Sequence, residues 1–175
     1  MENFKLTDHF SFFEFTQTGN TALQDLNRQK GLAIKGKLTA IAEVLEVLRE
    51  ELGHPLEIHS AFRCAELNGA TAGSSKTSQH MLGEAVDFSG PGQEDEAQID
   101  AFWKKVLGIL QKEGIAFGQL IKESAGRDHG RSNWVHLSLG APHREVAKCG
   151  QVMTMRDGTY TLVKTVTIGD GSALA

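Results

Sequence analysis

Apolar residues recur with helical spacing in two long segments of the chain. In residues 36–53 they fall on one face of a helix, and in residues 95–113 the same period returns. A glycine, Gly53, closes the first segment, and glycine just after a periodic run is a common helix end. The pattern predicts two amphipathic helices, with these apolar faces: Leu38, Ile41, Leu45, Leu48 and Leu52 in the first, and Ile99, Phe102, Trp103, Val106, Leu107 and Leu110 in the second.

Shorter segments alternate apolar and polar residues and predict strands. They cover residues 56–60, 84–88, 116–121 and 134–139, and residues 151–168 read as a terminal hairpin that turns at Asp157-Gly158. Helices followed by several short strands predict an α+β fold, with an antiparallel sheet and helices packed on one side of it. A length of 175 residues suits a single domain, residues 1–175.

Composition and charge exclude several classes of protein. The chain carries 18 basic and 22 acidic residues and a formal net charge of −4, which argues against nucleic acid as a partner. No segment approaches the ~20 apolar residues of a membrane span, and the N-terminal residues have no signal-peptide core. Cys64 and Cys149 are either two free thiols, as in a protein made in the cytosol, or one bridge. The oligomeric state is left open.

Two of the seven histidines have suitable neighbours for metal binding. His80 precedes Asp87 by seven residues, and His136 lies mid-strand, with its side chain opposite to those of its apolar neighbours. If their strands lie close together, two imidazoles and a carboxylate converge as the three protein ligands of a catalytic zinc site on the sheet. The alternative is structural, with the histidines as hydrogen-bonding residues and Asp87 as a strand-end cap.

The segment around His80 also carries a recognisable signature. Ser78-x-His80-x-x-Gly83-x-Ala85-x-Asp87 resembles the S-x-H-x-x-G-x-A-x-D signature of the zinc D-Ala-D-Ala carboxypeptidase family, peptidases of bacterial cell-wall peptides. Further segments within residues 5–145, among them residues 60–63 and 134–136, are similar to a branch frequent in phages and prophages. The resemblance implies a hedgehog-like zinc fold with zinc held by His80, Asp87 and His136, and it leaves residues 146–175 as a hairpin extension.

The same resemblance implies substrate contacts. Arg63 corresponds to the arginine that grips a substrate carboxylate, a role that suits a planar guanidinium; the alternative is a structural ion pair. Ser78 corresponds to a serine that supports the site by hydrogen bonding, although a loop serine can equally cap a turn. Gln119 is either a substrate contact or a strand amide with structural partners.

The general base is where the chain departs from the family pattern. Many members carry a glutamate or aspartate three residues before the last zinc histidine, and here that residue is Asn133, which cannot accept a proton from water. Glu123 is the expected base, because the strands on either side of residues 123–133 are predicted to pair antiparallel. Asp128 and His129, in the connecting loop, are the alternatives.

The resemblance therefore implies a zinc metallopeptidase that hydrolyses peptidoglycan stem or cross-link peptides, as a carboxypeptidase or an endolysin. Such a protein would be made in the cytoplasm and act on the cell wall after lysis or delivery by a virion. The alternative is a non-catalytic, zinc-holding module that binds cell wall or belongs to a phage structure, motivated by Asn133. The bond that is cut stays open.

Overall fold

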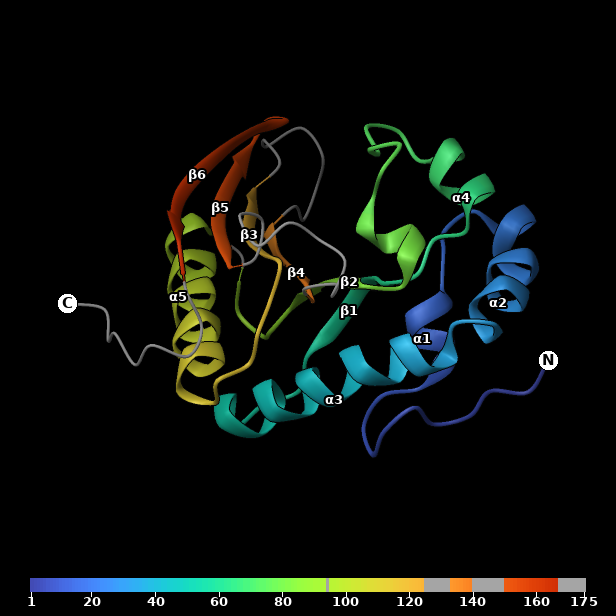
Figure 1. Cartoon of the computed structure of the whole chain (residues 1–175), viewed down its shortest axis with the longest axis horizontal. Helices are drawn as coiled ribbons and strands as arrows, with labels where there is room; N and C mark the ends of the chain where they lie inside the picture. The colour runs from blue at the N-terminus through green and yellow to red at the C-terminus, as the bar shows by residue number, and fades with distance from the viewer. Residues whose placement is uncertain (94, 125–132, 140–149, 167–175) are drawn as a thin grey trace. The chain divides into compact units, whose positions relative to one another are not determined.

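The computed structural model describes residues 1–93, 95–124, 133–139 and 150–166. The chain divides into two compact units, residues 1–91 and 92–175. Figure 1 labels the helices and strands of both units. Asp128, His129 and Cys149 lie outside the described residues, so the expectations for them stay predictions.

The first unit is mainly helical. Its long helix α3 confirms the first predicted helix, and Leu38, Ile41, Leu45 and Leu48 on one face of it are buried. Gly53 ends α3 in the left-handed conformation and donates its N–H to the carbonyls of Arg49 and Glu50. The elements of this unit are α1 (Phe12–Thr16), η1 (Thr21–Leu23), α2 (Gln24–Leu32), α3 (Lys35–Leu52), β1 (Glu57–Ser60), α4 (Ala65–Ala70), η2 (Gln79–Leu82) and β2 (Ala85–Ser89).

Among its described residues, the second unit contains one helix and four strands: α5 (Glu96–Lys112), β3 (Gln119–Ser124), β4 (Asn133–Ser138), β5 (Gln151–Arg156) and β6 (Thr159–Thr165). Helix α5 confirms the second predicted helix and begins with a capping box between Asp95 and Gln98. The expected hairpin is present as β5 and β6, joined at Asp157-Gly158. That residues 1–175 act as a single domain stays a prediction.

In the first unit β1 lies beside β2, and in the second unit the strands lie in the order β4-β3-β5-β6. The pairs β1–β2, β3–β4 and β5–β6 are antiparallel, and β3–β5 is parallel. The α+β class is therefore confirmed, with one difference from the fully antiparallel sheet that was expected. Strand β5 pairs with β3 on the edge that β4 leaves open, and it runs in the same direction as β3.

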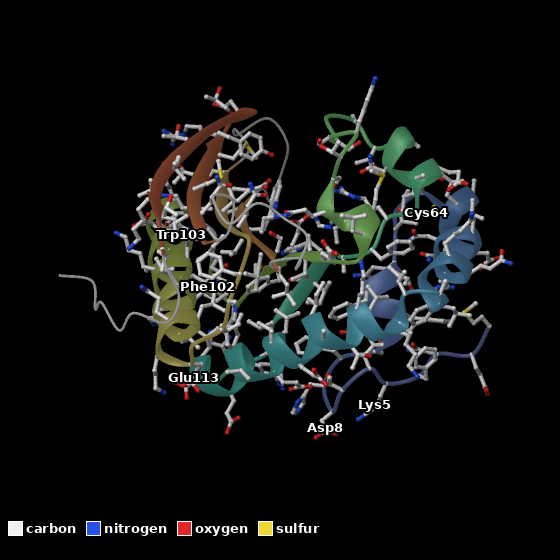
Figure 2. All side chains as sticks on the ribbon, in the orientation of Figure 1. Lys5, Asp8, Cys64, Phe102, Trp103 and Glu113 are labelled. Carbon is white, nitrogen blue, oxygen red and sulfur yellow. The ribbon has the colours of Figure 1, made fainter. Side chains whose placement is uncertain are left out.

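The strands of the second unit have two different faces. One face packs on α5: Leu120, Leu137 and Val152 are fully or almost fully buried, and Lys122 Nζ donates to Asp100 Oδ1 of α5 at 2.8 Å. Helix α5 contributes the buried rings of Phe102 and Trp103 to this core (Figure 2). Because side chains alternate along a strand, odd-numbered residues of β3, including Glu123, lie on the opposite face. The same alternation places His136 on that face with Glu123.

Candidate metal centre

His80 lies in the short helix η2 and is held by a backbone carbonyl. Its side chain is buried, with 3% of the residue exposed, and its Nδ1 lies 2.6 Å from the carbonyl oxygen of Ala61. A carbonyl only accepts hydrogen bonds, so Nδ1 carries the proton. Nε2 then points to Asp87, whose Oδ2 lies 3.3 Å away. This arrangement, with one ring nitrogen fixed by a hydrogen bond, is the usual way in which a ligating histidine is oriented.

Gly83 of the signature is required by the local backbone. It ends η2 at φ +64°, in the left-handed region that residues with a Cβ rarely adopt. A Cβ at this position would also lie 2.4 Å from Ile34 Cδ1 and 3.3 Å from Leu38 Cδ2. The glycine therefore lets the chain turn between His80 and β2, the strand that carries Asp87, while it packs closely against the α2–α3 region.

Residues 61–64 link Arg63 to the histidine. The N–H of Arg63 donates to the carbonyl of His80 at 3.2 Å, and Arg63 Nη2 donates to Ser78 Oγ at 3.3 Å. Arg63 and Ser78, both expected from the family resemblance, are thus brought together beside His80. Their contacts with a substrate stay a prediction.

Asn27 of α2 holds this segment in place, and sequence reasoning missed it. Its side chain is fully buried, with Nδ2 donating to the carbonyls of Thr16 and Phe62 and Oδ1 accepting from the N–H of Cys64. The bonds to Phe62 and Cys64 hold the residues immediately before and after Arg63. A single polar residue on a short polar helix has no sequence signal for such a role, so only its burial reveals it.

His136 and Glu123 lie on neighbouring strands of the second unit. Each is 8% exposed, and the register pairs His136 with Ile121 and Glu123 with Trp134. The antiparallel pairing expected for these strands is confirmed. Paired residues share a face, so Glu123 and His136 are diagonal neighbours on one face, ~7–8 Å apart by the geometry of such pairs.

Asn133, at the place of the usual base, points elsewhere. It pairs with Ser124 at the first position of β4. Because it precedes His136 by three residues along a strand, its side chain lies on the face opposite to that of His136. In this strand, a residue at position 133 does not face the histidine, whatever its chemistry.

His80, Asp87 and His136 form a group that could hold a metal ion. Each offers one ligand atom, and these atoms lie within 4.8 Å of one another. Within the part of the chain that the structure describes, no second group of this kind occurs. Two imidazoles and one carboxylate are a donor set that suits zinc.

Gln119 has structural partners. Its Nε2 donates to Gln151 Oε1 at 3.1 Å and approaches Met153 Sδ at 3.7 Å, both on β5. Its backbone N–H donates to Ser138 Oγ. The amide therefore ties β3 to β5 on the face that carries Glu123, and its contact with a substrate stays a prediction.

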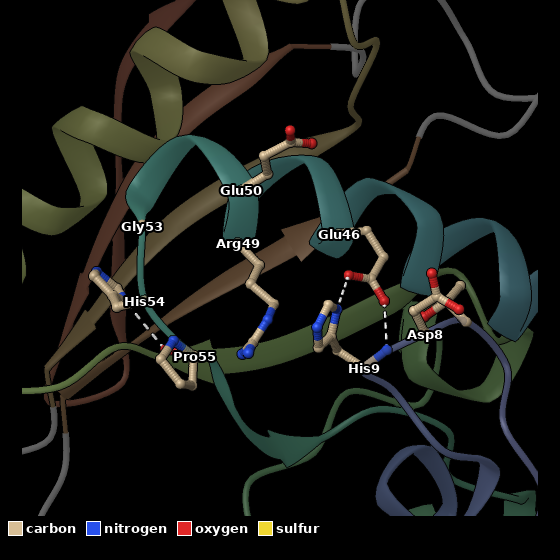
Figure 3. Close-up of a pocket in the computed structure, with 9 residues that line it drawn as sticks. Asp8, His9, Glu46, Arg49, Glu50, Gly53, His54 and Pro55 are labelled. Atoms are coloured by element: carbon tan, nitrogen blue, oxygen red, sulfur yellow. Dashed lines mark hydrogen bonds and ion pairs between the residues drawn. The ribbon is translucent and has the colours of Figure 1, made fainter.

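Two other histidines line a separate pocket of about 670 Å³ at the C-terminal end of α3 (Figure 3). His9 contacts Glu46 through both its backbone N–H and its Nδ1, and His54 Nδ1 lies 3.0 Å from the carbonyl of Pro55. Burial raises the pKa of Glu46, but hydrogen bonds from Thr7 and His9 outweigh it and leave the pKa below its usual value. None of the residues of the candidate centre lines this pocket.

Within the described residues, no helix combines the length and the apolarity that crossing a membrane requires. The sequence profile described as peptidase M15 matches residues 13–115, which include Arg63, His80 and Asp87 and end before Glu123 and His136. A search of curated proteins gives no match.

Proposed function

Because the chain belongs to the peptidase M15 family, whose members are zinc-dependent, we propose that it is a zinc metallopeptidase of peptidoglycan stem or cross-link peptides. The observation that carries the proposal is the group formed by His80, Asp87 and His136. In the proposal these three side chains are the zinc ligands. The family match supports a peptidase; the cell-wall substrate rests on the signature of residues 78–87.

The donor set fits zinc in two respects. Its protein ligands number three, as in catalytic zinc sites that keep a fourth position for water or substrate. The bond from His80 Nδ1 to the Ala61 carbonyl leaves Nε2 as the ligand atom, on the side of Asp87. When bound in such a site, zinc polarises a carbonyl and lowers the pKa of water to ~7.

Glu123 is the proposed general base. Its carboxylate lies on the same face as His136 and is almost fully buried, in a region of low dielectric where a positioned base is effective. It accepts a proton from the attacking water while the water oxygen bonds to the peptide carbonyl carbon. The carbon–nitrogen bond then breaks, and the proton passes from Glu123 to the leaving amine.

Arg63 is the proposed anchor for a substrate carboxylate. The bonds of its backbone to His80 and of its guanidinium to Ser78 hold it beside the metal ligand, so a carboxylate bound there would be positioned relative to the scissile bond. A net charge of −4 provides no general attraction to an acidic cell wall. Recognition in the proposal therefore depends on local contacts such as Arg63, with Ser78 and Gln119 as further candidates.

Metal analysis and peptide hydrolysis test the proposal together. The purified protein should hold one zinc per chain, release new amino groups from peptidoglycan, lose this activity with a chelator and regain it with zinc. His136→Ala should lose both zinc and activity. A protein without stoichiometric zinc, whose His136→Ala variant hydrolyses cell wall normally, would contradict the proposal.

Glu123→Gln separates the base from the metal site. The variant should keep zinc while kcat falls by roughly 10²- to 10⁴-fold, the usual contribution of a general base. Glu113→Gln, which removes a carboxylate at the end of α5, is the matched control and should be active. Zinc retained without any hydrolysis by the wild-type chain, together with binding to cell wall, would instead support the non-catalytic module that Asn133 suggests.

A further inference from the structure

The face that carries Glu123 and His136 continues across the hairpin. The register of the second unit places Glu123 opposite Met155 on β5, and Met155 opposite Tyr160 on β6. A second row runs from His136 through Ile121 and Met153 to Leu162. Because directly paired residues share a face, both rows form one surface that leads from the proposed catalytic residues to the edge of the sheet.

The outer part of this surface, on β6, is apolar and exposed, whereas Met155 on β5 is only 9% exposed. We call Met153, Met155, Tyr160 and Leu162 the hairpin platform. Tyr160 is 56% exposed and Leu162 is 51% exposed, so a large aromatic ring and an aliphatic side chain lie side by side in solvent. Exposed apolar groups that gather on one surface, rather than singly, are typical of binding sites.

The platform lies within reach of a substrate held at the catalytic residues. Neighbouring strands are ~4.8 Å apart, so Tyr160, two strands away from Glu123, is roughly 10 Å from it along the row. This distance corresponds to about three extended peptide residues. A substrate whose scissile bond lies at Glu123 therefore extends over the platform with the next part of its structure.

The chemistry of the platform indicates which part that is. Among the described residues of β5 and β6, those on this face carry no charge: the platform itself, with Gln151 and Thr165 beside it. The charged residues Arg156 and Lys164 pair with residues of the other face, and Arg156 contacts Glu96 of α5. A carboxylate-rich peptide finds no partner there, whereas an uncharged sugar ring can pack its C–H face on a tyrosine ring.

We propose that the hairpin platform is a subsite for an uncharged N-acetylated amino sugar ring, so that the preferred substrate is a stem peptide still attached to its glycan. The inference rests on the proposed peptidase function and deepens it. The platform lies outside residues 13–115, so it belongs to the part of this chain that the family match does not cover. Glycan recognition then favours cleavage near the sugar end of the peptide.

Two substrates and two variants on one strand test the subsite. The substrates are a disaccharide-linked stem peptide and the same peptide without sugar. Tyr160→Ala removes the ring, and Thr161→Ala is the matched control, because Thr161 pairs with Thr154 and lies on the opposite face. Tyr160→Ala should raise KM for the disaccharide peptide by about 3- to 10-fold, the range of one aromatic contact, with kcat unchanged. The free peptide should be hydrolysed equally by both variants.

An equal effect of Tyr160→Ala on both substrates, or the same effect from Thr161→Ala, would overturn the subsite and leave the peptidase function standing. Direct binding separates the two proposals if the wild-type chain hydrolyses neither substrate. In an NMR titration with the free disaccharide, shifts confined to β5 and β6 and lost in Tyr160→Ala support the subsite without any catalysis. Absence of such shifts in the wild-type chain contradicts it.

Discussion

The two units position their parts of the candidate centre in different ways. In the first unit, irregular backbone places the side chains: η2, the turn at Gly83 and residues 61–64 are joined by hydrogen bonds from His80 and Asn27. In the second unit, regular strands place Glu123 and His136, and their common face follows from pairing register alone. The first arrangement depends on particular residues, and the second depends on a ladder that many sequences can form.

This difference explains where the sequence is informative. An irregular turn needs a glycine at one position and small or polar residues at others, so the first unit carries a readable signature, and its residues 13–91 fall within the family match. A strand needs only alternation, so the second unit shows little beyond a histidine between apolar neighbours. In this chain the turn around His80 is therefore recognisable from the sequence, whereas the strand that carries Glu123, the proposed base, is not.

The largest expected effect comes from breaking the turn in the first unit. Gly83→Ala adds a Cβ at a left-handed position and against Ile34 Cδ1. The folded state is therefore destabilised both by backbone strain and by steric overlap with Ile34. The free energy of unfolding should fall by about 3 kcal/mol, measured by urea denaturation. Gly73→Ala is the control, since Gly73 has the same sign of φ but nothing within 4 Å of the added Cβ. It should lose only about 1 kcal/mol. Equal losses in the two variants would show that contact with Ile34 is unimportant.

An intermediate effect is expected from the hydrogen bonds that flank Arg63. Asn27→Ala leaves the carbonyl of Phe62 and the N–H of Cys64 without their partner, and should cost about 2 kcal/mol of stability. Under the proposed function, it should also raise KM, because Arg63 loses its support. Gln24→Ala provides the comparison: Gln24 also donates to the Thr16 carbonyl, but among the described residues it makes no hydrogen bond to residues 61–64. A KM that rises equally in both variants would exclude a specific role for Asn27.

The smallest effect is expected in the second unit, at the contact between α5 and β3. Hydrogen bonds from Lys104 and Lys122 lower the pKa of Asp100 below its usual 3.8. A lowered carboxyl pKa contributes stability above pH 3.8, and this contribution disappears as the pH falls through the lowered value. Asp100→Asn should therefore be less stable than the wild type by about 0.5–1 kcal/mol at pH 7, and the difference should disappear as the pH falls through the lowered pKa of Asp100. Thermal unfolding across this pH range measures it, and a difference that persists at low pH would show that the ion pairs are not its cause.

Periodicity was sufficient for the long helices, because α3 and α5 each bury one continuous face, whereas β6 is exposed along most of its length and was predicted from its alternation and the Asp157-Gly158 turn. Periodicity was insufficient for α4 (Ala65–Ala70), which no pattern in the sequence predicted. Helix α4 has six residues and depends on tertiary contacts, so local pattern does not reveal it. The parallel pairing of β3 with β5 was also missed, since alternation within a strand carries no information about its partner.

The residues of the candidate centre that the sequence pointed to are of types that seldom occur together, whereas the supporting residue that it missed is of a common type. His80, Asp87 and His136 stood out because two imidazoles and a carboxylate have few reasons to converge. Asn27 did not, because an asparagine on a polar helix is ordinary until its burial is known. The orientation of Asn133 away from the face of His136 likewise required the register of β4.

Cys64, at the start of α4, can report how often the segment that holds Arg63 opens locally. Its free thiol is buried, and burial raises its pKa, so the reactive thiolate is scarce in the closed structure. Alkylation of Cys64 then requires local opening of the structure. Its rate therefore measures how often residues 61–64 lose their hydrogen bonds to Asn27. Peptide mapping after timed alkylation reads this residue separately from Cys149. The chain thereby contains its own reporter for local opening of residues 61–64.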